Sequence, residues 1–245
     1  MLRIIWLEQS GVEPGVSAHQ RRQLLENAGI DYLRLNWKRG CRDELAALAA
    51  PNLTWADGRN RLFLEVKGDY DYYIFSDDDI ELTSTAFSPF VGLRTDLERW
   101  SPLTGTVRSY QDWAQRRTRS MPLKKAVRIA AHDQQVQIVS GEVADAVLPG
   151  PFSGAHASMW HIQMTGFTRW QNRQLLLPTE SATNRNSLGH EHERLHSTFT
   201  APEQIMARLK QDFDYLNRRS RSSIVKYRNW VVRRNLLMAL IDSVR

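Results

Sequence analysis

Three consecutive aspartates, Asp77–Asp79, are the residues of this sequence best suited to chemistry. They directly follow residues 70–76 (YDYYIFS), a run with strong β propensity. Alternate side chains of an extended segment point the same way, so we expect Asp77 and Asp79 to share one face. Two such carboxylates repel unless a cation neutralises them, and Mg²⁺ or Mn²⁺ prefers oxygen ligands. The triplet therefore predicts a divalent-cation site; the alternative is a solvated turn with a helix-capping aspartate.

The elements before the triplet alternate between strands and helices. Such alternation favours βαβ units and a parallel sheet, and therefore an α/β fold. Ligands of parallel sheets bind at the carboxyl ends of strands, where the triplet lies. Strands are expected at residues 3–7, 31–37, 53–55 and 70–76, and helices from Ser17 to Gly29, over 42–50 and from Asp57 to about Gly68.

The second half is less regular. It shows no internal repeat and no low-complexity linker, so we expect one domain followed by a helical tail. Strands are expected at 103–107 and 135–140, a broken helix over the basic, aromatic residues 108–128, a turn at 149–154, a polar loop over 178–196 and helices after Pro202.

Residues 58–80, GRNRLFLEVKGDYDYYIFSDDDI, resemble the central motif of GT-A glycosyltransferases of the family-2 type. That motif has Arg-Asn at a helix start, then Gly with acidic or aromatic residues, then an apolar strand that runs into D-x-D. The matching parts are Arg59–Asn60, Gly68–Tyr70 and Asp77–Asp79. The strand–helix alternation extends the resemblance loosely over residues 1–107.

The resemblance implies a GT-A-like, Rossmann-type mixed sheet flanked by helices, with a C-terminal basic helical extension. It further implies a catalytic domain over residues 1–202. Residues 1–107 would be its nucleotide-sugar-binding half and residues 108–202 its acceptor half. Residues 203–245 would form the basic amphipathic tail.

The resemblance also implies roles for residues of the motif. Mn²⁺ or Mg²⁺ would lie between Asp77 or Asp79 and the diphosphate of a UDP- or GDP-linked sugar, where it would stabilise the leaving phosphate. Asp77 or Asp78 would hydrogen-bond the ribose or the donor sugar. Arg59, with Asn60 beside it, would pair with a phosphate or orient the triplet; a surface arginine near a helix start is the alternative.

The end of the first strand is the expected place for the nucleotide base. Glu8, Gln9 and Ser10 are the polar residues there, just before Gly11. This expectation rests on position alone, because ligands of α/β sheets bind where the parallel strands end.

Five of the seven histidines lie between residues 156 and 196. His190 or His192 is expected to give the cation an imidazole ligand, because a late segment does so in some GT-A enzymes. His192 and His196 have the i, i+4 spacing of a metal site on a helix, but the order HEHERLH is not H-E-x-x-H. The alternative is a hydrophilic mobile loop, which would also be able to close over the donor.

An inverting transferase needs a base that takes the proton of the acceptor hydroxyl. Family-2-like enzymes usually carry an aspartate for this in an acidic motif after a turn. The matching residues 148–164 contain the turn PGPFSG but no acidic pair. His156 and Asp133 are therefore the candidate bases, and inversion or retention of the anomeric configuration stays open.

Charge is concentrated in the tail. Residues 203–245 hold ten Lys or Arg and four Asp or Glu, so their formal charge equals the +6 of the whole chain. The neutral remainder gives no reason to expect nucleic-acid binding, and the tail has no nucleic-acid-binding motif. An apolar stripe beside Arg218–Arg219 and Arg233–Arg234 suits an anionic membrane surface. Packing on the domain and self-association are the alternatives.

Composition excludes several classes. No apolar run approaches the roughly 18 residues of a membrane-spanning helix. The single cysteine, Cys41, excludes an internal disulfide and a multi-cysteine zinc site. The N-terminus resembles a first strand rather than a signal peptide. We therefore expect a cytoplasmic protein, with a peripheral position on the inner face of the membrane as an option.

The sequence thus predicts a metal-dependent glycosyltransferase that acts on a glycan or lipid-linked glycan, with a role in surface polysaccharide synthesis by analogy with relatives. A haloacid-dehalogenase-type phosphohydrolase is the alternative enzyme, but its D-x-D follows the first strand and Thr or Val stands where this chain has Glu81. A basic-tail adaptor that binds anionic lipid or nucleic acid is the non-enzymatic alternative. It leaves Asp77–Asp79 and Arg59–Asn60 unexplained.

Overall fold

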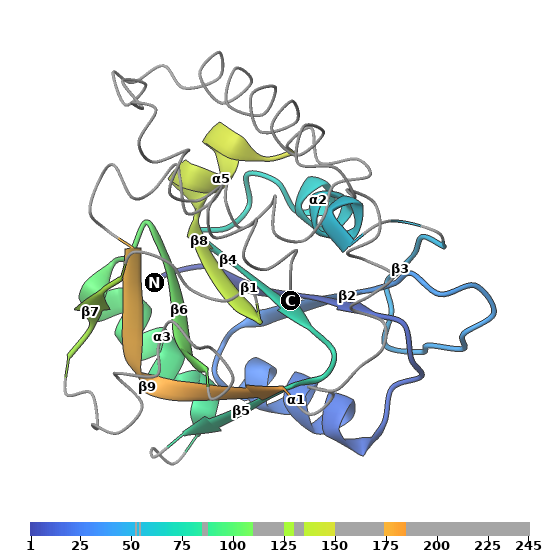
Figure 1. The fold of residues 1–245 in the computed structure, drawn as a ribbon, viewed down its shortest axis with the longest axis horizontal. Helices are drawn as coiled ribbons and strands as arrows, with labels where there is room; N and C mark the ends of the chain where they lie inside the picture. Colours follow the sequence, from blue (N-terminus) through green and yellow to red (C-terminus); the bar gives the residue numbers. More distant parts are fainter. Residues whose placement is uncertain are drawn as a thin grey trace, which may run out of the picture.

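The computed structural model describes residues 1–51, 53, 55–84, 88–109, 125–129, 135–149 and 174–184. These residues form one mixed sheet between helices (Figure 1). Its strands are β1 (Ile4–Ser10), β2 (Asp31–Asn36), β3 (Leu48–Ala49), β4 (Tyr72–Asp77), β5 (Ile80–Ser84), β6 (Thr104–Ser109), β7 (Val127–Arg128), β8 (Val136–Ser140) and β9 (Gln174–Asn184). They lie in the order β3-β2-β1-β4-β8-β6-β9-β5, and β7 pairs with β9.

The first half of the sheet is parallel. β1 pairs in parallel with β2 and with β4, and β3 pairs in parallel with β2. Parallel strands need a connection that crosses from one strand end to the other, and helices lie in two of these connections, α1 between β1 and β2 and α2 between β3 and β4. β8 then pairs antiparallel with β4, so the later strands make the sheet mixed. The expected α/β fold with a mixed sheet is confirmed, and the carboxyl ends of β1, β2 and β4 meet at one edge.

Helices cover both faces of the sheet (Figure 1). The helices α1 (Val16–Asn27) and α3 (Pro89–Trp100) lie on one face, and α2 (Trp55–Glu65) and α5 (Gly141–Val147) lie on the other. All side chains of β1 are buried, and they alternate between the two faces. Trp6 meets Phe90 of α3 edge-to-face at 5.4 Å, and Phe63 of α2 meets Tyr73 at 5.1 Å. Two apolar cores therefore hold the central strands.

The expected helix over residues 42–50 is wrong. Oδ1 of Asp43 accepts hydrogen bonds from the backbone N–H groups of Leu45 at 3.1 Å and Ala46 at 3.0 Å. Its Oδ2 accepts from Nε of Arg34 at 2.7 Å. An aspartate that binds nearby backbone amides favours a turn over a helix. The chain instead turns and pairs with β2 through β3.

Several expected boundaries also move. The strand expected at 53–55 is wrong, because α2 begins at Trp55. Asp57 therefore lies in the first turn of α2, where a negative charge favours the helix N-terminus. Ser17 lies inside α1, whose N-cap is Gly15. The polar loop expected from residue 178 is wrong as far as Asn184, because β9 pairs with β5 and β6 over those residues.

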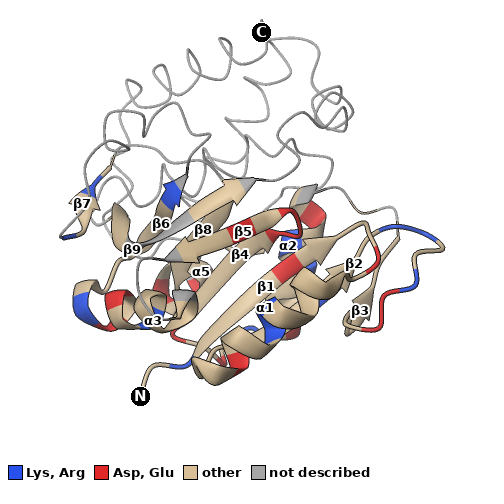
Figure 2. Ribbon diagram, turned by 90° about the horizontal axis from the view of Figure 1, so that it is seen from below, with Lys and Arg blue, Asp and Glu red and all other residues tan. Residues whose placement is uncertain are grey.

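Four candidate site residues and the tail lie outside the described residues. They are Asp133, His156, His190, His192 and residues 203–245. Within the described ranges, no helix is long and apolar enough to cross a membrane. In Figure 2, acidic residues mark the turn from β4 to β5, which is the place of the candidate site.

Candidate functional site

The aspartate triplet lies where β4 turns into β5. Asp77 is the last residue of β4, and Asp78 and Asp79 form the turn before Ile80 begins β5. The backbone is no longer extended after Asp77, so the alternation that would place Asp77 and Asp79 on one face does not apply here. All three aspartates are partly exposed. The triplet thus presents carboxylates at the carboxyl edge of the parallel strands.

The carboxylate of Asp77 is held from two directions. Its Oδ1 accepts a hydrogen bond from Nε2 of Gln9 at 3.2 Å, and Gln9 stands directly across from it on β1. The same oxygen accepts from Nη2 of Arg59 at 3.4 Å. The Asp77 side chain is 29% exposed, whereas that of Arg59 is 1% exposed. Buried donors beneath a partly exposed carboxylate orient it toward solvent.

Arg59 approaches Asp77 from the face of the sheet that α2 covers. It lies on α2, its Nη1 donates to Oε1 of Gln137 at 3.3 Å, and its guanidinium lies 5.7 Å from the ring centre of Phe75. Asn60, the next residue of α2, is also buried. Of the two roles expected for Arg59, its buried position beside Asp77 suits orientation of the triplet.

Close packing of α2 on β1 brings these groups together. A Cβ atom at Gly58 of α2 would lie 2.6 Å from Oε1 of Gln9. Glycine therefore lets the helix approach the side chain that donates to Asp77. Near the start of α2, Gly58 thus leaves space for the Gln9 side chain, and Arg59 contacts Asp77.

The turn residue Asp78 is held from the opposite face. Its Oδ2 accepts a hydrogen bond from Oγ of Ser10 at 2.5 Å. Its backbone carbonyl accepts from Nη2 of Arg21 at 3.2 Å, and the same nitrogen donates to the carbonyl of Ile80 at 2.6 Å. The triplet is therefore tied both to the end of β1 and to α1.

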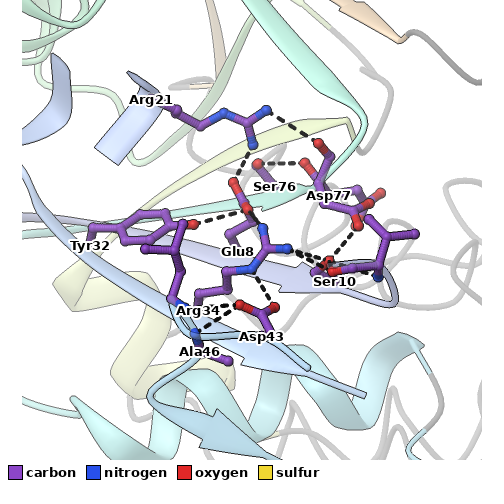
Figure 3. A network of polar contacts seen from close by, with 12 residues as sticks. Glu8, Ser10, Arg21, Tyr32, Arg34, Asp43, Ala46, Ser76 and Asp77 are labelled. Atoms are coloured by element: carbon purple, nitrogen blue, oxygen red, sulfur yellow. Dashed lines mark hydrogen bonds and ion pairs between the residues drawn. The ribbon is translucent and has the colours of Figure 1, made fainter. Parts of the chain in front are cut away.

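These contacts join a buried ionic network around Glu8 (Figure 3). Glu8 is fully buried and accepts hydrogen bonds from Arg21, Arg34 and the hydroxyl of Tyr32. Burial and the charge of Glu8 raise the pKa of Tyr32, which stays a neutral donor. Burial would lower the pKa of Arg34, but Glu8 and Asp43 outweigh it and raise that pKa. Glu8 is thus enclosed in the fold rather than presented to a nucleotide base.

Sequence reasoning did not find the partners of Glu8. A signal was present, because a glutamate inside the apolar run of β1 needs a buried cation. Arg34 stands directly across from Glu8 in the register of β1 and β2. Arg21 carries no such signal, since it comes from α1 and reaches Glu8 only when the helix packs on the sheet.

The aspartates fit a hard divalent cation in the chemistry of their donor atoms. Asp77 and Asp79 offer oxygen donors at a partly exposed turn, as Mg²⁺ and Mn²⁺ require. Within the described ranges, no group of three His, Cys, Asp or Glu side chains is placed to hold a metal. The predicted imidazole donors, His190 and His192, lie outside those ranges.

No family model and no curated protein matches this chain. Among solved structures, the chain is similar to GalNAc-T7 in complex with UDP, GalNAc and Mn²⁺. The two are 10% identical with a TM-score of 0.50, and the match covers 75% of this chain and 43% of that chain. The fold is GT-A-like. The GT-A-like region thus spans less than half the length of that relative.

A second solved structure also resembles the GT-A-like chain. It is a hypothetical transferase from Thermus thermophilus, which is 9% identical with a TM-score of 0.34. That match covers 60% of this chain and 69% of the other. The resemblance expected from residues 58–80 is therefore met at the level of the fold by the first of the two structures.

Proposed function

We propose that this protein is a metal-dependent glycosyltransferase that moves a sugar from a nucleotide-sugar donor to a glycan or lipid-linked acceptor. The supporting observation is the aspartate triplet at the carboxyl end of β4 in a GT-A-like sheet, with Asp77 held by Gln9 and Arg59. The relative with this fold was solved with UDP and Mn²⁺. UDP and Mn²⁺ belong to the ligand classes that the triplet was expected to bind.

Different residues of this chain would bind the cation and position its ligands. Asp77 and Asp79, with His190 or His192, would hold Mn²⁺ or Mg²⁺, which as a Lewis acid stabilises charge on the diphosphate leaving group. Gln9 and Arg59 keep the Asp77 carboxylate turned toward the ligand side.

Further roles stay proposals. Asp78, or Asp77, would meet the ribose or the donor sugar, and Gln9 and Ser10, at the end of β1, would lie near the nucleotide base. His156 or Asp133 would take the proton of the acceptor hydroxyl. Asn60 would support the nucleotide side of the site.

The cellular setting is also a proposal. By analogy with family-2 enzymes, the acceptor would belong to surface polysaccharide or lipopolysaccharide synthesis and the transferred group would be a hexose or a related sugar. Residues 203–245 would hold the protein against an anionic membrane surface on the cytoplasmic side, or join two copies of the chain. A phosphohydrolase is not favoured, since the triplet follows the fourth strand in the chain rather than the first.

Calorimetric titration of the full chain tests the function. We expect UDP or GDP to bind more tightly with Mn²⁺ than without it, and we expect Asp79→Ala to abolish that gain. Glu26→Ala, which removes an exposed carboxylate on α1, serves as the control and should bind like the wild type. Absence of any nucleoside diphosphate binding to the wild-type protein would refute the proposal. Oligonucleotide binding that survives Asp79→Ala, in a protein that binds no nucleoside diphosphate, would instead favour the adaptor.

A further inference from the structure

Arg21 holds the backbone of the triplet turn from outside the motif. Its Nη2 donates to the carbonyls of Asp78 at 3.2 Å and Ile80 at 2.6 Å, which flank Asp79 on both sides. A planar guanidinium donates along fixed directions, so one side chain can set two carbonyls relative to each other. The position of Asp79 in the turn is therefore defined by a helix that carries no ligand of its own.

Ser10 holds the same turn through a side chain. Its Oγ donates to Oδ2 of Asp78 at 2.5 Å and accepts from Nη2 of Arg34 at 2.6 Å. The Ser10 hydroxyl thus bridges the Arg34 guanidinium and the Asp78 carboxylate, so the position of Arg34 helps to fix that carboxylate. The turn has two supports, the guanidinium of Arg21 on its backbone and the hydroxyl of Ser10 on its side chain.

Both contacts lead to the carboxylate of Glu8, directly from Arg21 and through Arg34 from Ser10. Arg21 and Arg34 each pair with one carboxylate oxygen of Glu8, whose side chain has no exposure. The side chains of Arg21 and Arg34 are 11% and 1% exposed. Asp43 pairs with Arg34 and brings the formal charge of the four groups to zero. A closed, neutral and buried network resists rearrangement, because moving one member leaves a buried charge without its partner.

We propose that Arg21, anchored by Glu8, is a positioning residue for the cation and nucleotide site, acting through its hydrogen bonds on the turn that carries Asp78 and Asp79. This inference rests on the proposed function. Mutation of groups that orient metal ligands without touching the metal typically lowers the affinity of the protein for the metal by about 10- to 100-fold. Loss of Arg21 should therefore reduce the Mn²⁺-dependent gain in nucleotide affinity by that factor, and it should also lower the stability of the fold, because the buried Glu8 loses one of its two cations.

Arg94 offers a matched control. It is an arginine on α3 whose Nη1 donates to the carbonyl of Gly29 at 2.7 Å and whose Nη2 donates to the carbonyl of Leu2 at 2.8 Å. Its side chain is 14% exposed, close to the value for Arg21. It clamps backbone carbonyls as Arg21 does, but at the end of the sheet opposite the triplet. Substitution of Arg94 should remove a comparable backbone clamp without the effect on the site, and with a smaller loss of stability, because its partner Glu98 is 48% exposed whereas Glu8 is fully buried.

The experiment compares Arg21→Gln, Arg21→Lys, Ser10→Ala and Arg94→Gln in the full chain. The dissociation constant of UDP, or of GDP if the wild type prefers it, is measured with and without Mn²⁺, and thermal unfolding reports the fold. We expect the Mn²⁺-dependent gain to fall about 10- to 100-fold in Arg21→Gln. It should recover in part in Arg21→Lys, which keeps the charge beside Glu8, and stay at the wild-type value in Arg94→Gln.

The outcomes separate the two proposals. A wild-type gain in Arg21→Gln would overturn the positioning role and leave the proposed function standing. An equal fall in Arg94→Gln would also overturn it, since the effect would then follow general destabilisation. If neither Arg21 variant folds, Ser10→Ala decides, and an unchanged gain there overturns the inference. A wild-type protein without Mn²⁺-dependent nucleotide binding refutes the proposed function and this inference with it.

Discussion

Glu8→Gln is expected to destabilise the protein strongly, because Glu8 is the buried anion on which two arginines depend. The substitution keeps the shape of the side chain and removes its charge. One of its two acceptor oxygens becomes an NH₂ group that faces a guanidinium. Arg34, whose side chain is 1% exposed, and Arg21, at 11%, then lose their common counter-charge.

The magnitude follows from these contacts. Hydrogen bonds to charged groups contribute about 1.5–3 kcal/mol each, and the substitution converts at least one of them into a repulsive contact. Removal of one partner from a buried ion pair typically costs about 3–5 kcal/mol. Asp43 stays beside Arg34 and attenuates the loss. We therefore expect the free energy of unfolding to fall by about 3–5 kcal/mol.

Urea unfolding, followed by tryptophan fluorescence, measures this difference. The control is Glu26→Gln, which breaks an exposed i, i+4 pair with Arg22 on α1 and should cost no more than about 0.5 kcal/mol. A loss in Glu8→Gln below about 1 kcal/mol, the range of an exposed pair, would refute the reasoning that this anion is the centre of the network.

Two more substitutions give distinct outcomes. Gly58→Ala should keep the fold, because alanine favours a helix by about 1 kcal/mol, yet it should weaken Mn²⁺-dependent UDP binding, because its Cβ would lie 2.6 Å from Oε1 of Gln9. Gly15→Ala, with open space around it, is the control. Unchanged UDP binding in Gly58→Ala would contradict the expectation. Burial, with the hydrogen bond to Asp31, raises the pKa of Tyr70 to about 12. An unfolded tyrosine ionises near pH 10, so this contribution to stability is full below about pH 10 and is lost as the pH rises toward 12. Tyr70→Phe should therefore lose less stability over that window in urea unfolding, and identical pH profiles would contradict this.

Local pattern was sufficient where the physics is local. The apolar run of residues 3–7 and the aromatic run of 70–76 predicted β1 and β4, because buried strands need continuous apolar side chains. Gly29, with φ of 67°, ends the α1 region as expected from the conformational freedom of glycine. Over residues 42–50 the alanine- and leucine-rich pattern failed, because Asp43 binds both the backbone and Arg34.

The sequence by itself determined the α/β fold, the parallel first half of the sheet and the position of Asp77–Asp79 at a strand end. Periodicity and spacing carry that information, since each depends on neighbours in the chain. Only the tertiary structure decided what holds the triplet. Gln9 and Arg59 meet at Asp77, and Arg21 reaches the turn beyond it, from elements far apart in the chain. Burial makes such contacts strong, and burial exists only after the helices have packed on the sheet.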